Sequence, residues 1–88
     1  MVVVYVIESL LDQTWYTGIA IDAHDRLAEH NHGKNRFTKG HRPWKLIFTE
    51  IRPNWTAARE REKYLKSAAG KRWLKKYLSR GDTSSLPD

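Results

Sequence analysis

An unbroken apolar run at residues 2–7 constrains the fold of this chain more than any other stretch. Every residue of the run except Tyr5 is β-branched, and β-branched side chains favour β-strands. Because neither alternate set of side chains is polar, other elements must cover both faces of such a strand. The run therefore predicts a buried strand that holds Tyr5 on a rigid backbone.

A second group of β-branched and aromatic residues, 15–20, follows a turn-like segment at 9–14. Two such runs joined by a short turn predict an antiparallel hairpin, which would bring Tyr5 and Tyr16 close together. Gly18 lies inside the second strand, where a glycine weakens strand pairing. Its position indicates a bulge or the close approach of another backbone segment or a ligand.

Charged and polar side chains follow in a predicted helix at residues 23–31. Asp22 is suited to cap this helix, and Asp25 falls in its first turn. Arg26 and His30 are four residues apart, so they lie on one helical face. A guanidinium matches the geometry of phosphate, and an imidazole exchanges protons near neutral pH. Together with the two phenols, these groups predict a phosphodiester site that still lacks a carboxylate for a metal ion.

The segment 56–66 is rich in strong helix formers and offers the missing carboxylates. Thr56 is the expected N-cap of this helix. Glu60 and Glu62 point about 200° apart around the axis at roughly 100° per residue, so only one of them would face the site. On sequence alone, a surface ion pair with Lys66 explains Glu62 equally well.

The remaining segments complete an α+β arrangement in one small domain at residues 1–80. A third strand is expected at 45–51, and helices are expected from about residue 57 and about residue 70, with Gly70 between them. The chain has 88 residues and no cysteine, so the domain must fold by packing alone. Residues 81–88 are mostly small and polar and are expected to form a frayed, flexible tail.

Basic residues outnumber acidic ones, 16 to 10, which gives a formal net charge of +6. Such a balance favours polyanions, and nucleic acid is the simplest partner. The bias is strong in a loop-like segment at 32–42, where basic, aromatic and amide side chains are interleaved. The residues expected to bind nucleic acid there are Lys34, Arg36, Lys39 and Arg42. A second basic cluster at 71–76 fits a solvated helix face better than a dedicated DNA contact.

Other sites receive less support from the sequence. Four histidines fall within one region: His24, His30, His32 and His41. They lack a recognised zinc spacing, and magnesium prefers oxygen ligands, so no histidine metal site is expected. Most tryptophans of so small a domain are needed for its core, and Trp55 is the expected exception. No signal peptide or membrane span is visible, so an intracellular, cytoplasmic protein without a membrane partner is expected.

Four residues recur in the order and spacing of a known family: Tyr5, Tyr16, Arg26 and His30. The pattern resembles the active-site half of the GIY-YIG endonucleases, and the chain is similar to their small stand-alone members. The resemblance runs from about residue 2 to about residue 74 and includes the segments 26–31, 38–39, 43–46 and 70–74.

The chain departs from the family pattern at three places. The first motif is Val3-Val4-Tyr5, without the family's Gly and Ile, and the second is Tyr16-Thr17-Gly18, with Thr in place of Ile. Several members carry an Asn beyond the metal-binding Glu, whereas no Asn follows Asn54 here.

By resemblance, the expected fold is a small three-stranded antiparallel sheet flanked by helices. The implied activity is metal-dependent hydrolysis of DNA phosphodiester bonds, with structure-selective cleavage in DNA repair or recombination. The stretch 61–66 looks like the one in which a single Glu holds the metal ion. The resemblance therefore assigns Mg²⁺ or Mn²⁺ to Glu62, with Glu60 as the fallback.

The resemblance also implies a role for each remaining site residue. Tyr5 would be the general base that activates water, with its phenol acidified by the metal and by Arg26. Tyr16 would orient that water or the phosphate. Arg26 would offset transition-state charge, and His30 would relay a proton or hold Tyr5 in place. The expected products carry 5′ phosphate and 3′ hydroxyl ends.

Two functions from other classes stay open beside the nuclease. One is a nucleic-acid-binding module that has lost efficient cleavage, and the other is an adaptor whose basic surface binds acidic proteins. Taken singly, Tyr5 also fits a core phenol, and Arg26 fits a surface pair with Glu29 or Asp22. The expected partner is DNA, branched or damaged, and the expected state is a monomer or weak dimer.

Overall fold

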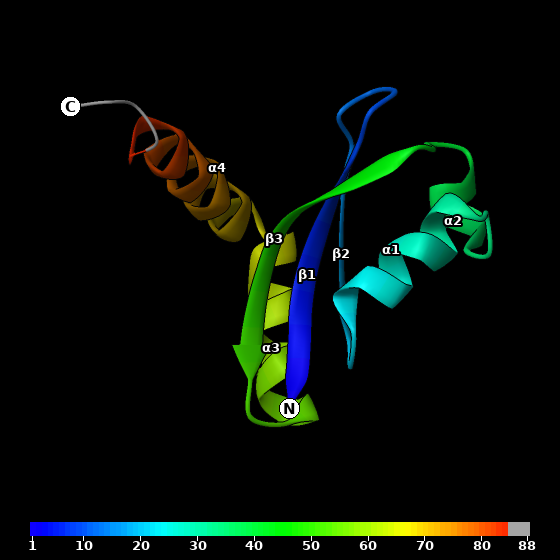
Figure 1. Cartoon of the computed structure of the whole chain (residues 1–88). Coiled ribbons are helices and arrows are strands. Elements are labelled where there is room, and N and C mark those ends of the chain that lie inside the picture. The colour runs from blue at the N-terminus through cyan, green and yellow to red at the C-terminus, as the bar shows by residue number, and fades with distance from the viewer. Residues whose placement is uncertain (85–88) are drawn as a thin grey trace.

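The computed structural model describes the backbone of residues 1–84 and the side chains of residues 1–79, and it contains one three-stranded antiparallel sheet. The elements in chain order are β1 (Val2–Ser9), β2 (Trp15–Ala20), α1 (Ala23–Asn31), α2 (Arg36–Lys39), β3 (Trp44–Arg52), α3 (Trp55–Lys66) and α4 (Ala68–Ser84). The α+β architecture predicted from the sequence is confirmed (Figure 1).

Strand β1 lies between β2 and β3, as its apolar sequence requires. Its residue Tyr5 is directly opposite Gly18 of β2 and Thr49 of β3. The register with β3 shifts between Val6 and Ile7, which leaves one extra residue of β3 in a bulge. Strand β2 is therefore an edge strand, and its outer side is not paired with another described strand.

Helices cover both faces of the sheet and create two separate cores. On one face, Val4 and Val6 of β1 pack in a buried cluster with Leu65 of α3 and Leu74 of α4. On the other face, Tyr5 and Ile7 pack in a second cluster. Its other buried members are Ala20, Ala23 and Trp44. In Figure 1, α1 and α2 lie to one side of the strands, while α3 runs behind them.

Two helices begin where an asparagine or aspartate can act as cap. Asp22 caps α1 as predicted, because its Oδ1 accepts a hydrogen bond of 3.0 Å from the amide of Asp25. The N-cap of α3 is Asn54, whose Oδ1 accepts from the amide of Ala57 at 2.8 Å. The prediction of Thr56 as cap was wrong, since asparagine is at least as good a cap and stands two residues earlier.

The segment predicted as a basic loop contains the short helix α2. Asn35 caps it, with Oδ1 accepting from the amides of Phe37 and Thr38. Periodicity cannot reveal a helix of four residues, but an Asn before such a turn is a capping signal.

Gly70 does not separate the last two helices, contrary to the prediction. The break is at Ser67, which has extended dihedral angles (φ −77°, ψ 163°) and whose Oγ accepts a hydrogen bond from the amide of Gly70. Gly70 lies in the first turn of α4, against the backbone carbonyl of Tyr64, where a Cβ atom would collide. Helix α4 continues through residues 81–84 of the predicted tail, and residues 85–88 lie outside the described part of the chain. The domain boundary at residue 80 remains a prediction.

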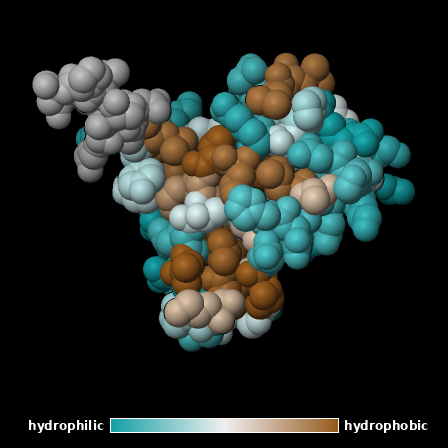
Figure 2. All heavy atoms as spheres, viewed as in Figure 1, coloured by the Kyte–Doolittle hydropathy of each residue, from teal (hydrophilic) through white to brown (hydrophobic). Residues whose placement is uncertain are grey.

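The hydropathy of the surface differs between the two ends of the sheet and the side covered by α1 and α2. Figure 2 shows hydrophilic side chains over α1 and α2, and hydrophobic ones at the tip of the β1–β2 hairpin and near the end of β3. Exposed apolar residues at those ends are Leu10, Leu11, Met1 and Ile51. Among residues 1–84, no helix has the length and apolar character needed to cross a membrane.

Replacement of Gly18 should disturb Tyr5 directly. A Cβ atom on Gly18 would lie 2.5 Å from Oη of Tyr5 and 2.7 Å from its Cζ. We expect Gly18→Ala to lower the free energy of unfolding by about 1–3 kcal/mol, because the buried ring must shift. Gly40→Ala is the matched control, since a Cβ there has no atom within 4 Å. Urea unfolding would contradict this account if both variants were equally stable.

Candidate active site

Tyr5, His30 and Thr38 form a buried row of hydrogen bonds between β1, α1 and α2. Oη of Tyr5 lies 2.9 Å from Nε2 of His30, and Nδ1 of His30 lies 2.7 Å from Oγ1 of Thr38. The exposed fractions are 1%, 3% and 0% in the same order, so water does not compete for these bonds. Tyr5 and His30 were candidate site residues from the sequence, whereas Thr38 was not.

Thr38 is held in place by its neighbours. The cap residue Asn35 binds its amide, and Nε1 of Trp44 donates to its carbonyl at 2.8 Å. Asn31 then joins α1 to β3: its Oδ1 accepts from the amide of Trp44 at 2.6 Å, and its Nδ2 donates to the carbonyl of the same residue at 3.0 Å. The imidazole of His30 is thus fixed by a network that spans three elements.

Tyr16 reaches the same imidazole from β2. Its ring meets that of His30 edge-on, with centroids 4.9 Å apart. Because Tyr5 is opposite Gly18 and Tyr16 is opposite Ile7, both phenols lie on the face of the sheet covered by α1. The predicted proximity of the two tyrosines is confirmed. The missing side chain of Gly18 leaves room for the Tyr5 ring, so the group that approaches Gly18 is a side chain and not the backbone segment or ligand that the sequence indicated.

Burial keeps the Tyr5–His30 pair neutral at neutral pH. Desolvation, and then Tyr16, raises the pKa of Tyr5 to about 12 against the opposing effect of Arg26. Desolvation, and then Arg26, lowers the pKa of His30, while Glu29 raises it. The expectation that Arg26 acidifies the phenol therefore has the right sign, but burial outweighs it. A neutral imidazole donates one hydrogen bond and accepts one, and the hydroxyl groups of Tyr5 and Thr38 can serve as its two partners.

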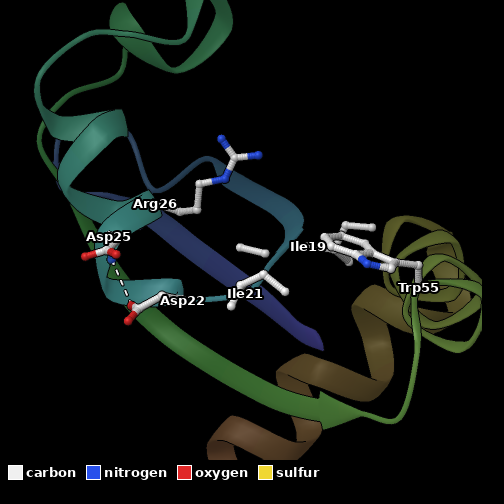
Figure 3. Close-up of a pocket in the computed structure, with 7 residues that line it drawn as sticks. Ile19, Ile21, Asp22, Asp25, Arg26 and Trp55 are labelled. Carbon is white, nitrogen blue, oxygen red and sulfur yellow. Dashed lines mark hydrogen bonds between the residues drawn. The ribbon is translucent and has the colours of Figure 1, made fainter. Parts of the chain in front are cut away.

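Arg26 lies on α1, one turn before the buried His30, and its charge acts on both Tyr5 and His30. Its Nη1 is 3.2 Å from Oε1 of Glu29, and both side chains are about half exposed. Such a surface pair contributes roughly 0–1 kcal/mol, so a phosphate can replace it at small cost. Figure 3 shows Arg26 extending from α1 toward a hollow of about 410 Å³, with Trp55 of α3 on its far side. Trp55 is 43% exposed, as the sequence predicted.

Glu62 is the better placed of the two candidate carboxylates. Its charge makes the smallest of the contributions that raise the pKa of Tyr5. Glu60 is exposed and is not among the groups that shift Tyr5. The side chain of Glu62 is 23% exposed, and Nζ of Lys66 lies 3.1 Å from its Oε2. The ion pair considered from the sequence is therefore present.

Glu62 offers one carboxylate for a magnesium ion that would be held jointly with substrate. Magnesium is commonly bound by one or two carboxylates together with phosphate oxygens and water. Among residues 1–84, no group of three or more histidine, aspartate or glutamate side chains could hold a metal. Glu62 could supply one oxygen ligand if Lys66 released it, and the remaining ligands would come from phosphate and water.

The four predicted nucleic-acid contacts lie on α2 or beside it. Lys34, Arg36, Lys39 and Arg42 are all exposed. Arg42 is the most constrained, because its Nε donates to the carbonyl of Lys39 at 2.9 Å. Since α2 also contains Thr38, this basic surface adjoins the buried row that ends at Tyr5.

Arg26 and Glu29 should shift the pKa of His30 in opposite directions. We expect the pKa of His30 to be below 6.5, to rise in Arg26→Gln, and to fall further in Glu29→Gln. Because the folded pKa is depressed, the neutral ring contributes stability above pH 6.5 that is lost as the pH falls through the folded value. NMR titration of the histidine ring signals, assigned with His30→Gln, measures this. A His30 midpoint above 6.5 would show that the ring is not buried as described.

Comparison with known proteins agrees with this geometry. The sequence model of the GIY-YIG catalytic domain matches residues 1–77. Over 62 residues the chain is 39% identical to the UPF0213 protein YazA of Bacillus subtilis, covering 69% of this chain and 63% of YazA, which is less than two thirds of that relative. It is 40% identical over 65 residues to a UPF0213 protein of Natronomonas pharaonis, covering 73% of this chain and 75% of the relative.

A solved structure supports the same relationship. The solution NMR structure of a UPF0213 protein from Bacillus halodurans has a TM-score of 0.53 and 32% sequence identity. The similarity covers 88% of this chain and 85% of that one. The order of the site residues, the fold and the similar proteins lead to one conclusion: this chain belongs to the GIY-YIG family, among small UPF0213-type proteins.

Proposed function

We propose that this protein is a metal-dependent endonuclease that hydrolyses phosphodiester bonds of DNA. The observation that supports this best is the buried hydrogen bond between Tyr5 and His30, with Tyr16 against the same imidazole. A core phenol needs only one backbone partner, whereas here two titratable groups with shifted pKa values share a bond beside an arginine and a glutamate. Shifted pKa values of this kind cluster at functional sites.

The buried row suggests how a proton leaves the attacking water. A phenol with a pKa of about 12 is a poor base by itself at neutral pH. If Tyr5 donates to Nε2 of His30, its oxygen takes the proton of the water while its own proton passes to the imidazole. The imidazolium so formed keeps its Nδ1–H bond to Oγ1 of Thr38. His30 thereby makes a weak base usable.

The remaining residues would hold the phosphate. Arg26 offers a guanidinium that exchanges its surface pair with Glu29 for a phosphate oxygen, and Tyr16 orients the water or that phosphate. Glu62 would hold Mg²⁺ or Mn²⁺, which supplies positive charge for the leaving 3′ oxygen. One such site nicks one strand, and cutting both strands requires a dimer or two encounters. A DNA substrate, branched or damaged, implies repair or recombination and a cytoplasmic location.

A nucleic-acid-binding module with little cleavage is the second candidate. Two observations favour it: Lys66 pairs with the carboxylate that would hold metal, and burial keeps the Tyr5 phenol protonated. The motif departures and the missing Asn after Asn54 point the same way. In this case the basic surface at α2 would still bind nucleic acid.

Cleavage of end-labelled single-stranded, duplex, flap and branched DNA with Mg²⁺ or Mn²⁺ tests the proposal. We expect Tyr5→Phe and Glu62→Gln to lower the rate by about 100-fold or more, since each removes a group with a chemical role. Glu60→Gln is the matched control, because it removes an exposed carboxylate from the same helix. It should cleave like the wild type.

The variants must also remain folded, which urea unfolding measures. If Glu60→Gln abolishes cleavage and Glu62→Gln does not, the metal ligand is Glu60. If no substrate is cut with either ion while salt-sensitive binding persists, the endonuclease proposal fails and the binding module replaces it.

A further inference from the structure

A groove of about 330 Å³ crosses the outer edge of β2, next to the candidate active site. The residues that concern us in this Phe37 groove are Trp15, Tyr16, Phe37, Leu65, Lys66 and Lys71. They come from both sides of the sheet: Phe37 from α2, and Leu65 and Lys66 from α3. The volume is at the lower end of the range of sites that take small organic groups, about 300–1,000 Å³.

The groove presents flat aromatic surfaces. The Phe37 side chain is 55% exposed although it is large and apolar. Its ring is 6.1 Å from that of Tyr16, at an angle of 31°, and 5.3 Å from that of His41. Trp15 is fixed by a hydrogen bond of 3.0 Å from Nε1 to Oε2 of Glu8. Phe37 is thus a half-exposed ring in a row of rings, and it belongs to neither buried core cluster.

Positively charged side chains also line the groove. Lys66 and Lys71 line it, and both are exposed. Aromatic faces combined with positive charge are the features by which proteins bind unpaired nucleotides, whose bases stack while their phosphates meet lysine or arginine. An apolar ligand would use the rings but would not match the lysines.

Two residues that line the groove also contact the candidate site residues His30 and Glu62. Tyr16 forms part of its wall and also contacts His30, at 4.9 Å between centroids. Lys66 lines the groove and also pairs with Glu62 at 3.1 Å. A nucleotide seated there would therefore be a close neighbour of the phosphate that is cleaved.

We propose that the Phe37 groove is a subsite for one nucleobase that has left its stack, beside the scissile phosphate, with Phe37 as the stacking surface and Lys71 as a phosphate contact. The inference rests on the proposed function, because that function brings DNA to the edge of β2. A base paired in a duplex cannot enter the groove without being extruded, which costs energy. The groove thus favours cleavage next to an unpaired nucleotide.

Position-dependent stacking tests the subsite without relying on cleavage. The probe is a set of single-stranded DNA oligonucleotides with 2-aminopurine at successive positions, in chelator, where stacking quenches its fluorescence. We expect quenching at a particular position next to the cleavage point mapped with metal. Phe37→Ala should abolish this quenching and weaken binding about 5- to 150-fold, the range for loss of one base–aromatic stack.

Three control variants make the result specific. Phe37→Tyr keeps a ring and should retain the quenching, and Tyr77→Ala removes another half-exposed aromatic ring, outside the groove. Lys71→Gln should reduce the slope of log affinity against log salt concentration by about 0.7. Lys76→Gln is its control, because Lys76 is on the same helix but outside the groove, and the slope should change less. Equal loss of quenching in Phe37→Ala and Tyr77→Ala would overturn the subsite.

The two proposals fail in different ways. Cleavage by the wild type without position-specific quenching would overturn the subsite and leave the endonuclease standing. Quenching that depends on Phe37 without cleavage of any substrate would support the subsite and overturn the endonuclease. Unchanged quenching in folded Phe37→Ala would show that the base stacks elsewhere.

Discussion

The burial of β1 on both faces is the constraint on which the rest of the structure depends. One set of its side chains, including Val4 and Val6, packs against α3 and α4. The other set, including Tyr5 and Ile7, packs under α1. Tyr5 is therefore a core residue and a candidate site residue at once. Its low exposure raises the pKa of its phenol, and the same burial fixes its bond to His30.

Much of this was predictable because it follows from local patterns. The apolar runs predicted the pairing of β1 with β2. Asp22 predicted the start of α1, because its side chain can bind a backbone amide there. The meeting of Tyr5 with Tyr16 followed from the hairpin. That His30 would be close to Tyr5 came from the family resemblance, since helical spacing alone placed it on a face of α1 without saying what that face would contact.

The unpredicted features depend on contacts between segments that are distant in sequence or too short to show a period. Thr38 becomes part of the site only because Asn31 and Trp44 tie α1 to β3 and fold α2 back over the imidazole. Gly70 resembled a helix break, but its missing side chain serves close packing against Tyr64. A glycine in a sequence does not reveal which of these two requirements it meets.

The division into two cores has a mechanical consequence. Arg26 belongs to the helix on one side of the sheet, and Glu62 belongs to the helix on the other. The two side chains therefore belong to different layers of the molecule, with the three-stranded sheet between them. A phosphate bound by both groups would link the two layers directly. Binding of such a phosphate would then stabilise both layers together, and a change in the packing of either layer would alter the phosphate site.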